Sequence, residues 1–113
     1  TLARKAYRRP PEPAERTALE KTYADLRTGG LTPAESVAGV VEAVLQSPQF
    51  LYLSEVGRDP AAAVGSVQPL TDHEVAARLS YGLWDTLPDA ELARLADEGK
   101  LRTVLGYIAS GEE

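Results

Sequence analysis

Apolar residues recur at helical spacing in several stretches of the chain, and the longest such stripe covers residues 37–45. Its members follow the pattern i, i+3, i+4, i+7 and i+8, and they are Val37, Val40, Val41, Val44 and Leu45. This spacing places them on one face of a helix, and the period outweighs the weak preference of valine for strands. We expect this helix to be the most deeply buried element of the fold.

Two helix starts are marked by a capping box, in which a threonine and a glutamate three residues later hydrogen-bond to each other's backbone. The two pairs are Thr32 with Glu35, and Thr71 with Glu74. Pro33 supports the first start because proline fits the first turn of a helix. Gly29 and Gly30 are expected to end an earlier helix over residues 14–28, whose inner stripe is narrow.

The second capping box opens a helix that runs towards the only tryptophan of the chain. The apolar stripe of this helix contains Val75, Leu79 and Leu83. We expect Trp84 to close a core at its end.

A second helix follows, with Asp85 or Thr86 as its cap and Pro88 in its first turn. The inner face of this second helix contains Leu92, Leu95 and Ala96. Gly99 is expected to end it.

These patterns predict an all-α fold of five to six short helices in an irregular bundle. Four segments are expected: residues 1–13 as the end of a helix plus a proline-rich connector, 14–56 as a helical half, 57–70 as a surface loop, and 71–113 as a helix–corner–helix motif with a trailing helix. In the second segment, the apolar cluster at residues 50–53 can be one helical turn or a short extended piece, and we prefer the helical turn. We expect it to pack in the core beneath Trp84, and the alternative is an aromatic patch that contacts a ligand. Apolar positions after Leu101 predict the trailing helix, but the native context of residues 103–113 is left open.

Net charge and amino-acid composition exclude several classes of partner and site. The net charge is −5 over 113 residues, and residues 1–9 hold four basic residues and no acid, so the rest of the chain is more acidic still. This balance argues against nucleic acid as a partner. The chain has no cysteine, which excludes a thiolate site, and it has no apolar run long enough to span a membrane. The absence of methionine leads us to expect a piece of a longer protein.

One group of side chains is a candidate ligand contact: Arg78, Tyr81 and Trp84, spaced three residues apart on one helix. A guanidinium beside aromatic rings can bind a carboxylate or a sugar. Such a row can equally tie helices together. The pair Arg8 and Arg9 has two similar interpretations, as a clamp for an anion or as partners for acids at a helix junction.

No catalytic, metal or cofactor site is predicted within the chain. His73 is expected to be exposed in the first turn of its helix, and no second ligand stands at helical spacing from it, so its role is left open. The paired carboxylates resemble helix-end and surface acids rather than acid–base catalysts. No serine belongs to a nucleophile motif, and no glycine pair is followed by the lysine of a phosphate loop.

Three motifs resemble parts of two bacterial families, numbers fifteen ninety-two and fifteen ninety-five of the domain-of-unknown-function series. The motifs are Ala-Tyr-Arg-Arg-Pro at 6–10, Ser-Pro-x-Phe-Leu with a following glutamate at 47–55, and Arg-Leu-Ser-Tyr-x-Leu-Trp with x-x-Leu-Pro-Asp at 78–89. Further positions of the pattern fall on Leu92, Leu95, Ala96, Gly99 and Leu101. The resemblance implies a helical module of a large exported protein, periplasmic or at the cell surface, which often carries a cytochrome c-like domain. It implies no activity.

The preferred function is therefore a non-catalytic structural or interaction module that packs against neighbouring domains of its parent protein. One alternative is part of the site of an exported haem-dependent oxidoreductase, with His73 or Arg78 at the rim of a pocket. Another is a module that binds carbohydrate or a cell surface through an exposed aromatic row. The first predicts that the side chains of Arg78, Tyr81 and Trp84 are buried. The oligomeric state is left open.

Overall fold

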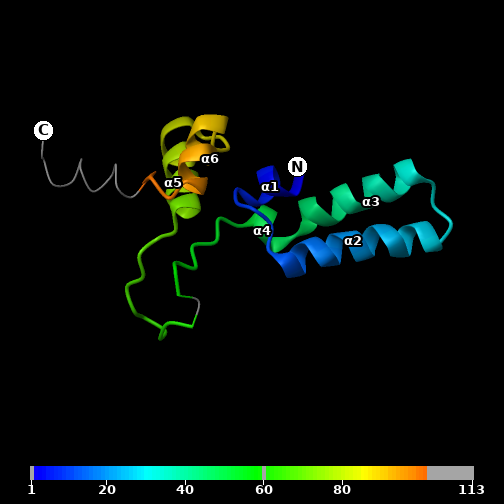
Figure 1. The fold of residues 1–113 in the computed structure, drawn as a ribbon, viewed down its shortest axis with the longest axis horizontal. Helices are drawn as coiled ribbons and strands as arrows, with labels where there is room; N and C mark the ends of the chain where they lie inside the picture. Colours follow the sequence, from blue (N-terminus) through cyan, green and yellow to red (C-terminus); the bar gives the residue numbers. More distant parts are fainter. Residues whose placement is uncertain (1, 60, 102–113) are drawn as a thin grey trace, which may run out of the picture. The chain divides into compact units, whose positions relative to one another are not determined.

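The computed structural model describes residues 2–59 and 61–101, and within them the chain is all-α, with no strand (Figure 1). Its helices are α1 (Leu2–Tyr7), α2 (Pro13–Thr28), α3 (Pro33–Gln46), α4 (Pro48–Leu51), α5 (Asp72–Trp84) and α6 (Ala90–Asp97). The predicted fold class is confirmed. Two compact units, Thr1–Leu53 and Ser54–Glu113, make up the chain. The trailing helix predicted after Leu101 lies outside the described residues.

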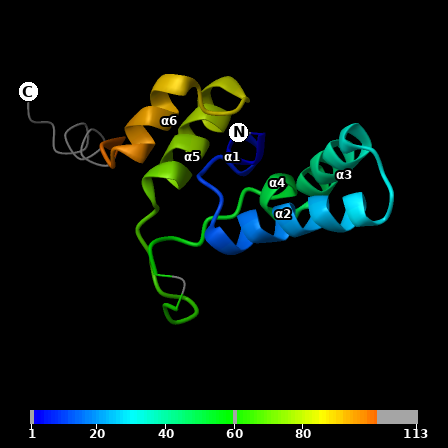
Figure 2. The ribbon, with the colours of Figure 1, turned by 45° about the vertical axis from the view of Figure 1, so that its right-hand side comes forward.

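In unit 1, α2 and α3 form a helical hairpin and lie side by side in both Figure 1 and Figure 2. The turn between them uses Gly30 at φ +93°, a backbone conformation that glycine adopts without strain. The capping box that starts α3 is confirmed. Its glutamate Glu35 accepts a hydrogen bond from the Thr32 amide at 2.8 Å, and the Thr32 hydroxyl accepts one from the Glu35 amide at 3.3 Å.

The core of unit 1 lies where α1, α3 and α4 meet. Its buried members are Ala6, Tyr7 and Val44, and Ala3, Leu19 and Phe50 pack against them. The expectation that the whole cluster at residues 50–53 is packed was wrong, because only Phe50 belongs to this core. The helix α4 is a single turn that ends at Leu51, and the side chains of Leu51, Tyr52 and Leu53 are exposed.

The expectation for α3 was also wrong, because it is not the most buried helix. It buries only Ser36 and Val44, whereas α5 buries five residues. Val37 and Leu45 remain 53% and 42% exposed. The reason is that α1, α2 and α4 contact α3 but do not surround it. The apolar stripe in the sequence therefore predicted more burial than the neighbouring helices provide.

In unit 2, α5 and α6 pack against each other, and their contact forms a second core. Its buried members are Val75, Ala76, Ala96 and Leu101, with Leu70, Leu79, Leu92 and Leu95 packed against them. The predicted inner face of α6 is confirmed. Leu83, however, lies outside this core and is 67% exposed. The buried stripe of α5 thus ends one turn earlier than the spacing predicted.

Both ends of α6 are defined by hydrogen bonds. Its N-cap is Asp89, whose carboxylate accepts a hydrogen bond from the Leu92 amide at 2.8 Å. The predicted cap at Asp85 or Thr86 was wrong, because residues 85–88 form the connection to α6 instead. At the other end, Gly99 adopts φ +67° and the Lys100 amide donates to the Leu95 carbonyl at 3.0 Å, as expected for a glycine-terminated helix.

Replacing Asp89 with alanine is expected to lower the free energy of unfolding by about 1 kcal/mol, the usual cost of losing an N-cap. The measurement is urea unfolding followed by far-UV circular dichroism. Asp59, an exposed acid outside the helices, provides the control: Asp59→Ala should cost less than half as much. Equal effects of the two changes would mean that the Asp89 cap contributes nothing specific.

Candidate functional site

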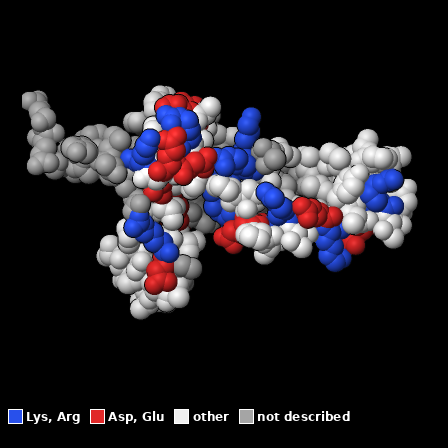
Figure 3. Space-filling model, in the orientation of Figure 1, with Lys and Arg blue, Asp and Glu red and all other residues white. Residues whose placement is uncertain are grey.

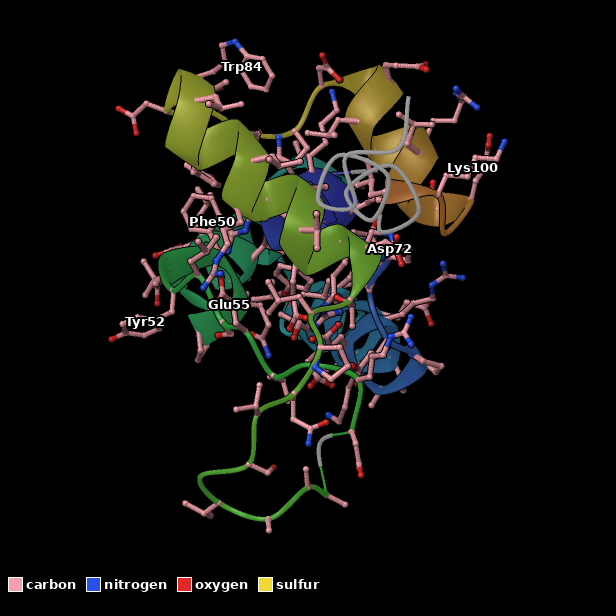
Figure 4. The ribbon with its side chains drawn as sticks, turned by 90° about the vertical axis from the view of Figure 1, so that its left-hand side faces the viewer. Phe50, Tyr52, Glu55, Asp72, Trp84 and Lys100 are labelled. Carbon is pink, nitrogen blue, oxygen red and sulfur yellow. The ribbon has the colours of Figure 1, made fainter. Side chains whose placement is uncertain are left out.

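The end of α5 carries a small apolar surface, which we call the tryptophan corner: Leu83, Trp84 and Leu87, with Asp85 between them. Trp84 is 65% exposed and Leu87 39%. Figure 4 shows the Trp84 ring at the end of α5, projecting away from the helix. The expectation that Trp84 closes a core was wrong. The large apolar ring of Trp84 is instead exposed to solvent.

The backbone turns sharply within this corner, and the turn explains the exposure. Asp85 has left-handed dihedral angles (φ 51°, ψ 37°), and its amide donates to the Tyr81 carbonyl at 3.2 Å, which ends α5. After Asp85 the chain runs without helical structure to the Asp89 cap. The turn connects α5 and α6, and these two helices pack against each other in a common core. The position of the tryptophan corner is therefore fixed relative to both helices.

The three candidate ligand contacts on α5 have different surroundings. Arg78 forms a two-pronged ion pair with Glu55, from Nε to Oε1 and from Nη2 to Oε2, both at 2.8 Å. Tyr81 is half-buried, and Trp84 is exposed. The guanidinium of Arg78 is therefore engaged with a carboxylate of its own unit. Arg78 keeps 64% of its side chain exposed, so the pair contributes at most about 1 kcal/mol.

Glu74 has a second role that its capping box did not reveal. One carboxylate oxygen accepts from the Thr71 amide at 2.7 Å and the Thr71 hydroxyl at 2.9 Å. The other accepts from the amides of Val56 and Gly57 at 2.7 and 3.0 Å. Burial alone would raise the pKa of Glu74, but these hydrogen bonds outweigh it and hold that pKa below its ordinary value. Glu74 and Arg78 together fasten residues 55–57 to α5.

His73 pairs with an acid that lies far away in sequence. Its Nε2 atom lies 3.0 Å from Oδ1 of Asp97, and only 26% of the His73 side chain is exposed. The expectation of an exposed histidine was wrong, because α5 and α6 run antiparallel and bring the start of one beside the end of the other. Spacing along a single helix could not reveal a partner on α6. This pair links the two helices at the end opposite the tryptophan corner.

The two N-terminal arginines act within unit 1. The Nη2 atom of Arg8 donates to the carbonyls of Gln49 and Tyr52 at 2.7 and 2.8 Å, and Nη1 donates to the Phe50 carbonyl at 3.4 Å. Arg8 therefore covers the carbonyl end of α4.

Arg9 acts as the partner of an acid at a helix junction, which is the second of the two interpretations given for the arginine pair. It binds Glu15 through two hydrogen bonds of 2.8 and 2.7 Å, and its guanidinium lies 5.9 Å from the centre of the Tyr7 ring. The hydrogen bond from Arg9 is the main reason that the pKa of Glu15 is lowered.

Within residues 2–59 and 61–101, no group of three His, Asp or Glu side chains is placed to hold a metal ion. No helix of this described part is long and apolar enough to cross a bilayer. The residues missed from sequence are Glu55, Val56 and Gly57. A glutamate closing the Ser-Pro-x-Phe-Leu motif was the only signal for them.

Two family models match the chain in succession. Residues 1–55 match PSD5, a protein of unknown function (DUF1595), and residues 70–109 match PSD4, a protein of unknown function (DUF1592). These are the two families indicated by the three motifs. No curated protein and no solved structure matches the chain.

Proposed function

We propose that this chain, which joins a DUF1595 segment to a DUF1592 segment, is a non-catalytic helical interaction module of a larger protein. The module packs against a neighbouring domain of its parent through the tryptophan corner. The burial of Arg78, Tyr81 and Trp84 that was expected for such a module was wrong, since Arg78 and Trp84 are exposed. The observation that carries this proposal is instead the exposure of Trp84 between two exposed leucines. A single exposed leucine is ordinary on a protein surface, but a tryptophan grouped with two leucines marks a contact surface.

The physical argument concerns the area that Trp84 can bury. A tryptophan removes roughly 150–250 Å² from water when it is covered, and tryptophan is among the commonest hot-spot residues of protein interfaces. The ring is attached to a helix whose other face is fixed in a core, so little entropy is lost when a partner covers it. Within the described residues, the Asp85 carboxylate forms no hydrogen bond or ion pair, which leaves it available to a donor of the partner.

The setting of the parent is part of the proposal. We infer an exported protein, periplasmic or at the cell surface, that carries a cytochrome c-like domain. Its support is the family resemblance of the three motifs. The proposed partner of the tryptophan corner is then a neighbouring domain of that parent, with the cytochrome-like domain as the first candidate.

A second candidate function is carbohydrate binding, and one observation favours it. Sugars stack on exposed aromatic rings, and the Trp84 ring is exposed. Tyr81 weakens this candidate because it is half-buried, so the corner does not offer the row of exposed rings that was expected of a carbohydrate binder. A part-site for haem has less support, since His73 and Arg78 both pair with carboxylates of unit 2.

Replacing Trp84 with serine is expected to weaken binding of the remainder of the parent protein at least tenfold, about 1.4 kcal/mol, because the partner loses its main apolar contact. Binding is measured by isothermal titration calorimetry with the remainder produced separately. The free energy of unfolding should change by less than about 0.5 kcal/mol, since Trp84 lies largely in solvent.

Val64 provides the matched control, because it is fully exposed in the same unit and lies outside the corner. Val64→Ser should leave the affinity unchanged. Equal affinities for the native chain and the Trp84 variant would contradict the proposed docking surface. Binding of soluble oligosaccharides that disappears only in the Trp84 variant would support the second candidate instead.

A further inference from the structure

The outer flank of α3 carries an apolar stripe that is largely exposed in unit 1. This α3 stripe consists of Ala34, Val37, Ala38, Val41 and Leu45, spaced i, i+3, i+4, i+7 and i+11. Of its members only Val41 is half-buried, and the others are exposed. Val44 faces the core of the unit, so the stripe is a second apolar face beside the buried one. In Figure 3 the surface over α3 is largely white, whereas charges gather over α2.

The shape of the stripe suits a helix. Because the stripe runs from Ala34 to Leu45, it extends over about 17 Å, roughly three helical turns. Alanines at positions 34 and 38 allow a neighbouring helix to approach closely, while Val37 and Leu45 are large enough to fit between its side chains. The partner helix α2 within the hairpin has no fully buried residue. A third helix would therefore complete a bundle that two helices leave open.

The charges beside the stripe specify the partner further. Glu35 and Glu42 lie three residues before and four residues after Ala38, which places both along one edge of the stripe. α3 contains no lysine or arginine. Glu35 is occupied by its capping box, whereas the one hydrogen bond of the Glu42 carboxylate among residues 2–59 and 61–101 comes from the Gln46 side-chain amide, at 3.1 Å. The edge of the stripe therefore carries two acids and no base, and Glu42 is the acid nearer its middle.

We propose that the α3 stripe is a docking site for an amphipathic helix of a partner polypeptide whose apolar stripe is flanked by lysine or arginine. The apolar contact supplies the affinity, and the basic flank pairs with Glu42. A second copy of this chain fits less well. Two antiparallel α3 helices would bring Glu42 of one copy near Glu35 of the other, and like charges repel. This surface belongs to unit 1 and does not depend on the tryptophan corner.

The test uses the full chain and two synthetic helical peptides. Both peptides carry leucine at heptad positions a and d; one has lysine at e and g, and the other has glutamate there. Fluorescence anisotropy of the labelled lysine peptide is expected to show saturable binding at least tenfold tighter than that of the glutamate peptide. The double change Val37→Ser with Leu45→Ser should weaken the lysine peptide at least tenfold, because it removes apolar area without changing charge.

Two matched controls distinguish docking from general attraction to an acidic protein. Val67→Ser changes a valine that is almost fully exposed elsewhere, and it should leave binding unchanged. Glu42→Lys should reduce the preference for the lysine peptide at least fivefold, whereas Glu20→Lys on the outer face of α2 should reduce it by less than twofold.

Equal binding of both peptides, or equal loss in stripe and control variants, would overturn the proposal. So would a dimer in sedimentation equilibrium that dissociates when Val37 and Leu45 become serine. That result would identify a second copy as the occupant. Far-UV circular dichroism establishes that each variant keeps its helices.

Discussion

Replacing Glu74 with alanine is expected to lower the free energy of unfolding by about 3 kcal/mol, because four donors lose one charged acceptor. Two of them belong to Thr71, and the others are the amides of Val56 and Gly57. Loss of an N-terminal cap alone costs about 1 kcal/mol, and the two further amides account for the rest. Urea unfolding followed by far-UV circular dichroism measures the change.

Glu35 is the matched control because it forms the same capping box without the two additional amides. Its carboxylate accepts from the Thr32 amide and hydroxyl only. Glu35→Ala should therefore lower the free energy of unfolding by clearly less than Glu74→Ala does. If the two alanine variants lost equal stability, the bonds from Glu74 to Val56 and Gly57 would contribute nothing.

The same carboxylate predicts a dependence on pH. The pKa of Glu74 in the folded chain lies below its ordinary value of 4.5, because hydrogen bonds outweigh the opposing effect of burial. Glu74 therefore contributes its full stability above pH 4.5, and the contribution is lost as the pH falls through the folded-state pKa. In Glu74→Ala this component of the acid-induced loss should be absent, so the stability gap between the two proteins narrows as the solution becomes acidic.

Replacing Arg8 with alanine is expected to lower the free energy of unfolding by about 2–3 kcal/mol. Its guanidinium donates to the carbonyls of Gln49, Phe50 and Tyr52, and hydrogen bonds from a charged donor are worth more than neutral ones. Without Arg8, the carbonyl end of α4 loses its cover and Phe50 is held less firmly in the core. Thermal or urea unfolding of the variant measures the loss.

The variant Arg8→Gly distinguishes the contribution of the guanidinium from the cost of the backbone conformation at position 8. Arg8 has a positive φ of 59°, a conformation that costs a non-glycine residue roughly 1–2 kcal/mol. Arg8→Gly should therefore be about 1 kcal/mol more stable than Arg8→Ala, yet less stable than the native chain. A glycine variant as stable as the native chain would contradict the role of the guanidinium. Arg16→Ala, an exposed change on α2, should have little effect.

Local signals predicted the helix starts well. The capping boxes at Thr32 and Thr71 each depend on two residues three positions apart, so the sequence contains the whole interaction. The cap of α6 was misplaced by several residues because three residues in a short stretch, Asp85, Thr86 and Asp89, can all serve as caps. The left-handed backbone of Asp85 decided between them, and no sequence pattern specified it.

Burial was predicted less well, because it depends on which elements surround a helix. The apolar pattern of α3 predicts one buried face, but the helix has two apolar faces and the hairpin covers only one. Trp84 was placed in a core for a similar reason: large aromatic side chains are usually buried. In both cases the apolar residues outnumber the neighbours that the described residues provide, and the surplus stays exposed.

Polar contacts between residues far apart in the sequence could not be predicted from sequence patterns. Arg78 and Glu55 are separated by 23 positions, and His73 and Asp97 by 24. Neither pair has a periodic relation in the sequence, so each became visible only when the fold brought its elements together. The candidate group of Arg78, Tyr81 and Trp84 was correctly placed on one helix, yet the structure gives the arginine a partner from outside that group.

The fastening of residues 55–57 to α5 also connects residues that match two different family models. Glu55 is the last residue of the DUF1595 match, whereas its partner Arg78 lies within the DUF1592 match. A first segment that lacked an acid at position 55 would leave Arg78 without its partner. The end of the first match therefore falls within a structural joint, so a chain cut after residue 55 keeps Glu55 but loses the arginine that binds it.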